Sequence, residues 1–193
     1  ILFYDFGTLN FSLLSKIEIT ENKELLLWIL TFISFSVKIP TIPFHLWLPE
    51  AHVEAPSAGS VILAGILLKL GGYGILRILL PIFPTASLFF LPLVYVSSSI
   101  SIIYASFTAI RQLDLKRIVA YSSIAHMNIV VLGLFSYSIE GLLGATFLMI
   151  GHGLVSGLLF FLIGFLYERY GTRLLAYYGG LAKIMPLFCF FFL

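Results

Sequence analysis

The chain has 193 residues, of which 60% are hydrophobic and only 10% are charged, and its mean hydropathy is +1.08. Since soluble domains are about 45–50% apolar and about a quarter charged, this composition excludes a water-soluble globular protein and a disordered tail. The net charge of +2 is spread without a basic stripe, which excludes a nucleic-acid-binding protein, and the single cysteine, Cys189, excludes a disulfide framework. We therefore expect an all-α polytopic membrane protein.

The uninterrupted apolar stretches predict one transmembrane domain over 1–193, with five full helices and two partial ones. A partial helix over 1–14 is followed by a span over 25–49 that contains three prolines. Because proline removes a backbone donor and clashes with the preceding turn, we expect this span to be broken near Pro40. After a short loop over 50–56, full spans are expected at 57–80, 87–110, 118–139 and 141–167, and a basic connection leads to a partial helix over 186–193.

The two ends of the sequence indicate an incomplete membrane domain. The chain begins at Ile1 without a methionine, and its last apolar run, 186–193, is much shorter than the roughly 20 residues of a membrane span. We therefore expect the chain to be a fragment whose last helix continues elsewhere or is completed by a neighbour.

Four of the predicted spans carry a titratable residue within three residues of the span midpoint. These residues are Lys38, Lys69, His126 and His152, in the spans predicted over 25–49, 57–80, 118–139 and 141–167. An ionisable residue at the bilayer centre costs at least about 2.5–3.5 kcal/mol even on permissive insertion scales. Since burial makes a lysine easier to deprotonate and histidine titrates near neutrality, the set predicts a proton relay.

Each of these residues also has a purely structural interpretation. A single histidine in a membrane helix can serve as an interhelical hydrogen-bonding group, which applies to His126 and to His152 taken alone. Lys38 is suited to the C-terminal end of a helix that stops near Pro40, and Lys69 is suited to a buried pairing with another helix. The occurrence of four such residues in four separate helices favours the relay.

The sequence contains no motif for chemistry other than proton transfer. It has no Gly-rich nucleotide loop, no nucleophile–base pair with suitable spacing and no His-x-x-x-His pair. His45 and His52 are seven residues apart, but Pro49 lies between them, so helical metal ligation is not supported. We therefore expect no catalytic residue, no metal and no cofactor on this chain. Gly65 and Gly153 belong to small-residue patterns that predict close helix packing within lipid.

Three segments of the sequence resemble one known family. They are FHLWLPEAHVEAPSAGSVILAGILLKLGGYG at 44–74, DLKRIVAYSSIAHMN at 114–128, and GHGLVS at 151–156 with LYER at 166–169. They resemble subunit 4 of NADH dehydrogenase (ubiquinone), the antiporter-like chain M of respiratory complex I, and the resemblance extends from about residue 25 to 186. The run His-x-Trp-Leu-Pro-x-Ala-His-x-x-Ala-Pro separates this subunit from its paralogues, subunits 2 and 5.

The resemblance implies a bundle of two inverted five-helix repeats, each with a discontinuous helix. It places Lys38 at the family's lysine on the first broken helix and Lys69 at the connecting lysine of the next helix. It also places His45, His126 and His152 on the family's central hydrophilic axis. The family's two partner glutamates lie on helices outside this chain, so another polypeptide would have to supply those helices.

The implied function is proton translocation in NADH:ubiquinone oxidoreductase, coupled to quinone reduction elsewhere in the complex. The implied partners are other membrane subunits of complex I and a companion chain that completes the missing helices. The implied location is the mitochondrial inner membrane, with a bacterial plasma membrane as the alternative. Two other functions stay open: a subunit of a multisubunit cation/proton antiporter, and a structural membrane-arm fragment without transport.

Overall fold

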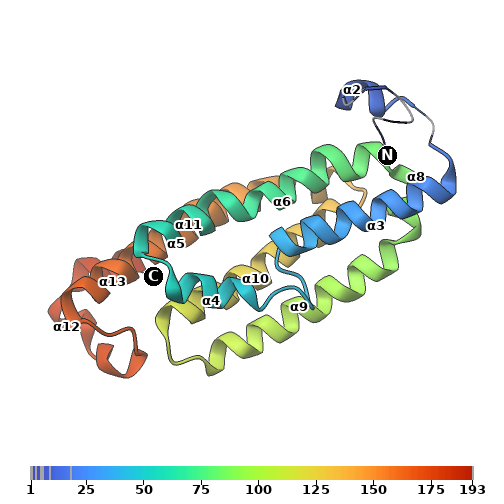
Figure 1. Ribbon diagram of the computed structural model, residues 1–193. Coiled ribbons are helices and arrows are strands. Elements are labelled where there is room, and N and C mark those ends of the chain that lie inside the picture. The colour runs from blue at the N-terminus through green and yellow to red at the C-terminus, as the bar shows by residue number, and fades with distance from the viewer. Residues whose placement is uncertain (1, 3, 5–6, 9, 18, 193) are drawn as a thin grey trace.

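The computed structural model describes residues 2, 4, 7–8, 10–17 and 19–192, and the regular elements among these residues are helices. Figure 1 shows the long helices running roughly parallel in one elongated bundle. The N-terminal segment lies at one end of the bundle, and helices α12 (Leu181–Ile184) and α13 (Pro186–Phe192) lie at the other. The chain is therefore the all-α bundle that its composition predicts.

In the described part of the chain, four helices are long and apolar enough to cross a membrane. They are the continuous helix over Ser57–Ile82, α9 over Leu91–Arg111, α10 over Leu115–Leu134 and α11 over Ile139–Tyr170. A further pair, Leu175–Ile184 with Pro186–Phe192, is bent by 119° and would give a fifth span if it crossed the membrane as one unit. The polytopic character expected from the sequence is thus present in the fold.

The helix over Ser57–Ile82 is not uniform. It consists of α5 (Ser57–Ile62), the π-helical turn η1 (Leu63–Leu67), α6 (Leu68–Gly74), a second π-helical turn η2 (Ile75–Leu79) and α7 (Leu80–Ile82). A π-helical turn widens the helix and alters its hydrogen-bond pattern, and such turns are frequent at functional sites.

The predicted broken span is interrupted just before Pro40. Helix α3 runs over Glu21–Lys38, the chain then turns through residues 39–46, and α4 runs over Trp47–Glu54. The loop expected over 50–56 is therefore wrong for residues 50–54, which are helical. Pro49 is tolerated because it stands in the first turn of α4, where backbone N–H groups have no intrahelical acceptor.

Three other helix ends differ from the sequence-based boundaries. Helix α10 begins before residue 118 because the Asp114 side chain caps it, accepting a hydrogen bond from the Lys116 N–H. It ends before residue 139, in a turn where Tyr137 has a φ of 54°. Helix α11 extends beyond residue 167 and stops at Gly171, whose φ of 67° is the left-handed conformation that glycine adopts without strain.

The other long helices extend a few residues beyond their predicted bounds, to Glu21, Ile82 and Ile139, and the remaining differences concern short helices. The span expected over 87–110 is divided into α8 (Pro84–Phe89) and α9. The partial helix expected over 1–14 includes residues 1, 3, 5–6 and 9, which lie outside the described residues, and its described part includes the short helix α2 (Phe11–Leu14). At the other end, α13 stands where the last partial helix is expected, and residue 193 lies outside the described residues.

The core at the N-terminal end of the bundle forms around Trp28 of α3. This indole is 1% exposed and stacks on Phe32 and on Phe90, with ring centroids 4.6 Å apart in both pairs. Its Nε1 donates a hydrogen bond to Ser87 Oγ at 2.8 Å. The buried Glu24 carboxylate accepts hydrogen bonds from the first turn of α8. These contacts fix α3 against α8, far from the break.

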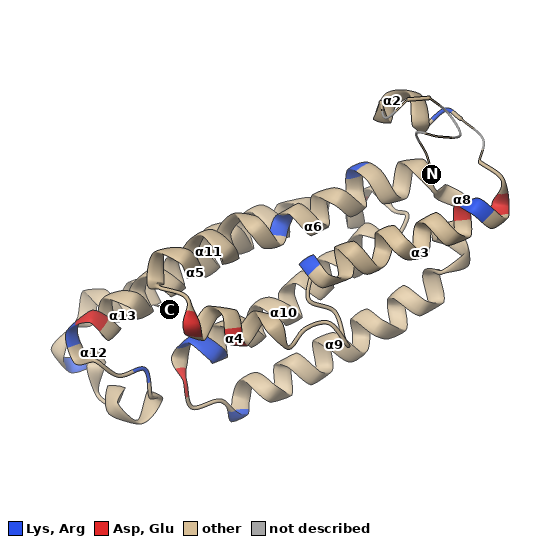
Figure 2. Ribbon diagram, in the orientation of Figure 1, with Lys and Arg blue, Asp and Glu red and all other residues tan. Residues whose placement is uncertain are grey.

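Charged residues are distributed unevenly along the bundle. Figure 2 shows most of them gathered toward its two ends, with isolated basic positions along the middle, in α6 and at the end of α3. Lys69 is the charged residue of α6 and Lys38 is the last residue of α3, whereas Arg77 lies further along the Ser57–Ile82 helix, in η2. The arrangement is that of a membrane bundle whose polar ends meet water, and it isolates the two lysines that require an explanation.

Candidate proton-relay site

Lys69 lies in α6, directly after the π-helical turn η1. Its Nζ donates a hydrogen bond to the carbonyl oxygen of Ala64, five residues earlier in the same helix. An ammonium group has three N–H donors, so this contact leaves others for neighbouring helices. The widened turn thus anchors the lysine head group without using all of its hydrogen-bonding capacity.

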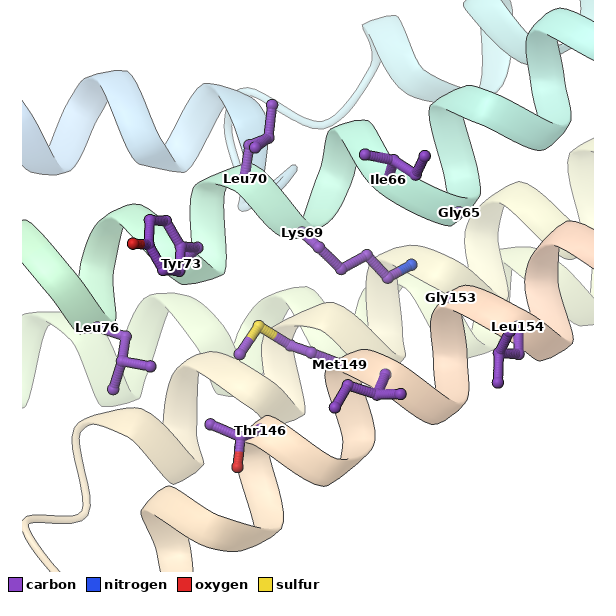
Figure 3. A pocket seen from close by; sticks show the side chains of 11 residues that line it. Gly65, Ile66, Lys69, Leu70, Tyr73, Leu76, Thr146, Met149, Gly153 and Leu154 are labelled. Atoms are coloured by element: carbon purple, nitrogen blue, oxygen red, sulfur yellow. The ribbon is translucent and has the colours of Figure 1, made fainter.

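The second partner of Lys69 comes from a different span. Lys69 Nζ lies 2.8 Å from Nδ1 of His152, which is in α11 and is 6% exposed. Figure 3 shows the Lys69 side chain reaching from α6 toward α11 beside Gly153. A Cβ on Gly153 would lie 2.9 Å from the carbonyl oxygen of Gly65 and 3.4 Å from Cε of Lys69. The two glycines therefore permit the close helix crossing over which the lysine reaches the histidine.

A groove of about 590 Å³ opens beside this crossing, between α6 and α11. Lys69 is the one charged residue among its described lining residues, and most of the others are apolar, including Leu76 and Met149 (Figure 3). Among all the described residues, including those at this groove, there is no group of three or more His, Cys, Asp or Glu side chains that could hold a metal ion.

His126 extends the pair to a third span. Its ring, in α10, meets the His152 ring edge to face, with centroids 5.6 Å apart and an interplanar angle of 82°. Lys69, His126 and His152 each lie within three residues of the midpoint of their observed spans. The structure thus brings three of the five predicted relay residues into one contiguous group at mid-bundle. Within this chain the His126 side chain is exposed, whereas His152 is buried.

Lys38 and His45 lie on either side of the helix break and do not join this group directly. Lys38 is the last residue of α3 and is exposed, and its side chain forms no hydrogen bond or ion pair with another described residue. Its charge stands at the C-terminal end of the helix, which favours cations. His45 is 6% exposed, and neither of its ring nitrogens has a partner among the described residues. Its ring meets Tyr104 edge to face at 5.1 Å.

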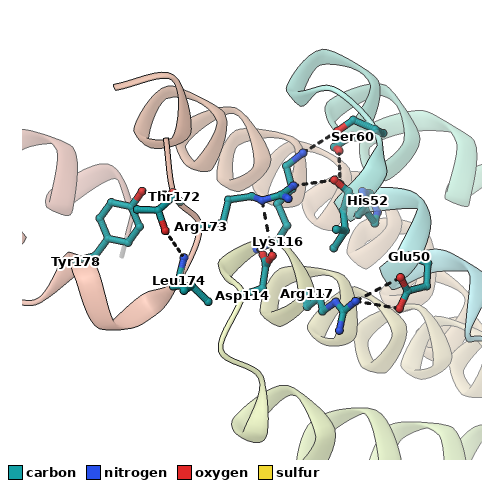
Figure 4. Close-up of polar contacts among 12 residues, drawn as sticks. Glu50, His52, Ser60, Asp114, Lys116, Arg117, Thr172, Arg173, Leu174 and Tyr178 are labelled. Carbon is teal, nitrogen blue, oxygen red and sulfur yellow. Dashed lines mark hydrogen bonds and ion pairs between the residues drawn. The ribbon is translucent and has the colours of Figure 1, made fainter. Parts of the chain in front are cut away.

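Two basic residues to which the sequence analysis gave no role bond to the C-terminal end of α4. Lys116 Nζ donates to the carbonyl oxygen of Ala55 at 2.8 Å, and Arg173 Nη1 donates to that of Val53 at 2.7 Å (Figure 4). Arg173 Nε also lies 3.7 Å from Oδ2 of Asp114. The last carbonyls of a helix have no intrahelical donor, and the helix dipole favours positive charge there. No sequence spacing links these residues, so their hydrogen bonds to the end of α4 can be seen only in the fold.

A comparison with protein families covers the entire chain. The family model described as "NADH:quinone oxidoreductase/Mrp antiporter, TM" matches residues 1–193. The chain belongs to this family.

Curated relatives of this antiporter-family chain are similar along its whole length. Two relatives named NADH-ubiquinone oxidoreductase chain 4, from Chondrus crispus and Marchantia polymorpha, are 56% and 57% identical over 192 residues. These matches cover 100% of this chain and 39% of each relative, so the chain spans about two fifths of the length of these relatives. The eukaryotic relatives, together with the apolar spans, assign the chain to the mitochondrial inner membrane as a multi-pass protein.

Solved structures of two different assemblies contain similar chains. A chain of respiratory complex I from Thermus thermophilus with bound NADH superposes with a TM-score of 0.90 at 30% identity, covering 97% of this chain and 40% of that chain. A chain of the Mrp complex from Dietzia sp. DQ12-45-1b superposes with a TM-score of 0.89 at 27% identity, covering 99% and 36%. The antiporter-like fold expected from the sequence is therefore confirmed.

Proposed function

We propose that this chain is part of a proton-translocating membrane subunit of NADH:ubiquinone oxidoreductase, respiratory complex I. The names of its curated relatives support the choice of complex. The observation that carries the proposal is the 2.8 Å contact between Lys69 Nζ and His152 Nδ1, with the His126 ring against His152. Three titratable groups from three spanning helices, with His152 in contact with the other two, would allow a proton to pass between helices.

The proposed transfer conserves charge at every step. A neutral His152 accepts on Nδ1 a proton from the Lys69 ammonium, which becomes a neutral amine. The resulting imidazolium releases the proton on its other nitrogen, Nε2, toward His126, which leaves the His152 proton on Nδ1. Before the next transfer, the His152 ring returns to the form protonated on Nε2, and Lys69 takes up a new proton from outside this group. Histidine suits the middle position because one ring nitrogen can bind a proton while the other releases one.

Lys38 and His45 extend the proposed relay to the helix break. The end of α3 packs closely on α6, since a Cβ on Gly71 would lie 3.0 Å from Cβ of Lys38. A change in the ion pairing of Lys38 would therefore alter the electrostatic potential at Lys69 and its affinity for a proton. In the assembled complex, quinone reduction on other chains would supply this change, and the role needs no cofactor or metal on this chain.

The exposure of Lys38 and His126 supports further polypeptide partners. Both side chains are exposed on this chain, at the middle of the bundle, where contact with lipid would be costly. We assign the covering surface to other membrane subunits of complex I and to a companion chain that carries acidic helices. Lipid would contact the remaining apolar surface.

Replacing Lys69 with alanine tests the proposed relay. In the assembled complex in membrane vesicles, proton translocation per NADH oxidised is expected to fall by half or more, because the alanine side chain neither binds nor releases a proton. The matched control is Leu70→Ala, a substitution at the next residue, whose side chain is exposed and apolar. Unchanged translocation in an intact Lys69→Ala complex would refute the relay and favour a structural role.

The runner-up function is that of a subunit in a multisubunit cation/proton antiporter. The close superposition with a chain of the Mrp complex favours it, since the two chains share the fold. Purification of the native assembly separates the two functions. Co-purification with NADH-oxidising activity is expected for complex I, and its absence from an intact assembly would favour the antiporter.

A further inference from the structure

The segment between α3 and α4, residues 39–46, carries backbone polar groups that no regular helix satisfies. In a membrane such groups need partners from the protein, because lipid offers none. Local bonds satisfy part of the segment: the Ile39 N–H donates to the Phe35 carbonyl at 2.7 Å, and the Thr41 N–H donates to the Ser36 carbonyl at 3.2 Å. Other groups depend on side chains from outside the segment.

Side chains from two spanning helices bond to the middle of this segment. The Ile42 N–H donates to Ser101 Oγ of α9 at 2.9 Å. Asn128 Nδ2 of α10 donates to the Pro40 carbonyl at 3.3 Å. The Pro40 carbonyl and the Ile42 N–H lie on either side of Thr41. Helices α9 and α10 therefore bond to the segment at positions two residues apart.

Each of these side chains is also tied to its own helix. The Ser101 hydroxyl donates to the Ser97 carbonyl at 2.7 Å while it accepts from the break. The Asn128 amide donates its second N–H to the Ile124 carbonyl at 2.8 Å. Ser101 and Asn128 are both 0% exposed, so water does not compete from bulk solvent. Each therefore links the break to a spanning helix through two hydrogen bonds made by a single side chain.

We infer that Ser101 and Asn128 are positioning residues that fix the helix break between Lys38 and His45. The inference rests on the proposed function, in which Lys38 and His45 extend the relay to the helix break. Loss of either side-chain contact leaves a buried backbone group without a partner, and the segment then shifts to satisfy it. A shift of the segment moves Lys38, two residues before Pro40, relative to α6. The consequence is uncoupling: NADH oxidation continues while fewer protons cross the membrane.

A matched set of serine variants in the assembled complex tests this inference. Ser101→Ala removes the acceptor for the Ile42 N–H, whereas Ser98→Ala changes a serine of the same helix that is equally buried but whose hydroxyl has no partner among the described residues. Ser101→Thr keeps the hydroxyl. Protons translocated per NADH are expected to fall by half or more in Ser101→Ala and to stay near the native value in Ser98→Ala and Ser101→Thr.

Asn128→Leu is a second, independent test of the inference, because leucine has a similar volume but cannot donate a hydrogen bond to the Pro40 carbonyl. Its expected result is the same uncoupling, measured on the assembled fraction so that poor folding is counted separately. If Ser101→Ala and Asn128→Leu translocate as many protons per NADH as Ser98→Ala, the inference is wrong. If they lower NADH oxidation and translocation in equal proportion, their role is only structural and the inference is also overturned. Lys69→Ala is measured in parallel, since normal translocation in that variant would instead refute the proposed function.

Discussion

His152→Gln is expected to abolish most NADH-driven proton translocation while leaving the assembled complex intact. Glutamine retains an oxygen that can accept the Lys69 hydrogen bond, and it fills a similar buried volume. It cannot bind and release a proton at neutral pH, so the step between Lys69 and His126 is lost. Translocation per NADH is therefore expected to fall by half or more, as in Lys69→Ala, because both substitutions interrupt the same transfer. The measurement is the initial rate of vesicle acidification per NADH oxidised.

The matched control for this substitution is His52→Gln. His52 is 0% exposed and stacks on Phe160 with ring centroids 4.1 Å apart, and its ring nitrogens have no partner among the described residues. His52→Gln therefore removes a buried imidazole ring, as His152→Gln does, but at a position without a contact to Lys69. Similar translocation in the two variants would contradict a specific role for His152.

Gly72→Leu is expected to prevent stable packing of the Ser57–Ile82 helix on α11. A Cβ at Gly72 would overlap Sδ of Met149, and a whole leucine side chain needs far more space. Overpacking of this kind typically costs about 1–3 kcal/mol, and separation of the helices would also break the Lys69–His152 contact. The expected results are less assembled complex and a lower thermal midpoint.

Gly144→Leu provides the control for that experiment. Gly144 also lies in a long apolar helix, α11, but a Cβ there would meet nothing within 4 Å. Because leucine has a higher helix propensity than glycine, this control should assemble normally. Equal assembly of the two variants would show that the close approach at Gly72 is unimportant.

The sequence predicts the helical class and the position of the break because both depend on local composition. Apolar stretches of span length have few alternatives in a membrane, and Pro40 cannot continue the helix that precedes it. The helical state of residues 50–54 was missed for a related reason. The sequence suggests that Pro49 breaks a helix, as Pro40 does. Proline is tolerated in the first turn of a helix, however, and only the structure shows that α4 starts at Trp47, just before Pro49.

The candidate site could be predicted in part. Depth along a span selected Lys69, His126 and His152, because an ionisable residue near a span midpoint is costly wherever its neighbours lie. Their contacts depend on how α6, α10 and α11 pack, and no spacing in the sequence encodes that. Lys38 illustrates the limit: it lies near the midpoint of the predicted 25–49 span, yet in the structure it ends α3 and does not contact the other three residues. The roles of Ser101 and Asn128 could not be predicted, because no spacing in the sequence shows that α9 and α10 pack against the break.

The most direct test of the relay is Lys69→Arg, measured as proton translocation per NADH in the assembled complex. Arginine keeps the positive charge and can still donate to a ring nitrogen, but it does not deprotonate in proteins. If Lys69 must release its proton to His152, translocation in Lys69→Arg should be as low as in Lys69→Ala while assembly stays intact. Native translocation in Lys69→Arg would show that only the charge and its hydrogen bonds matter, which would contradict the relay.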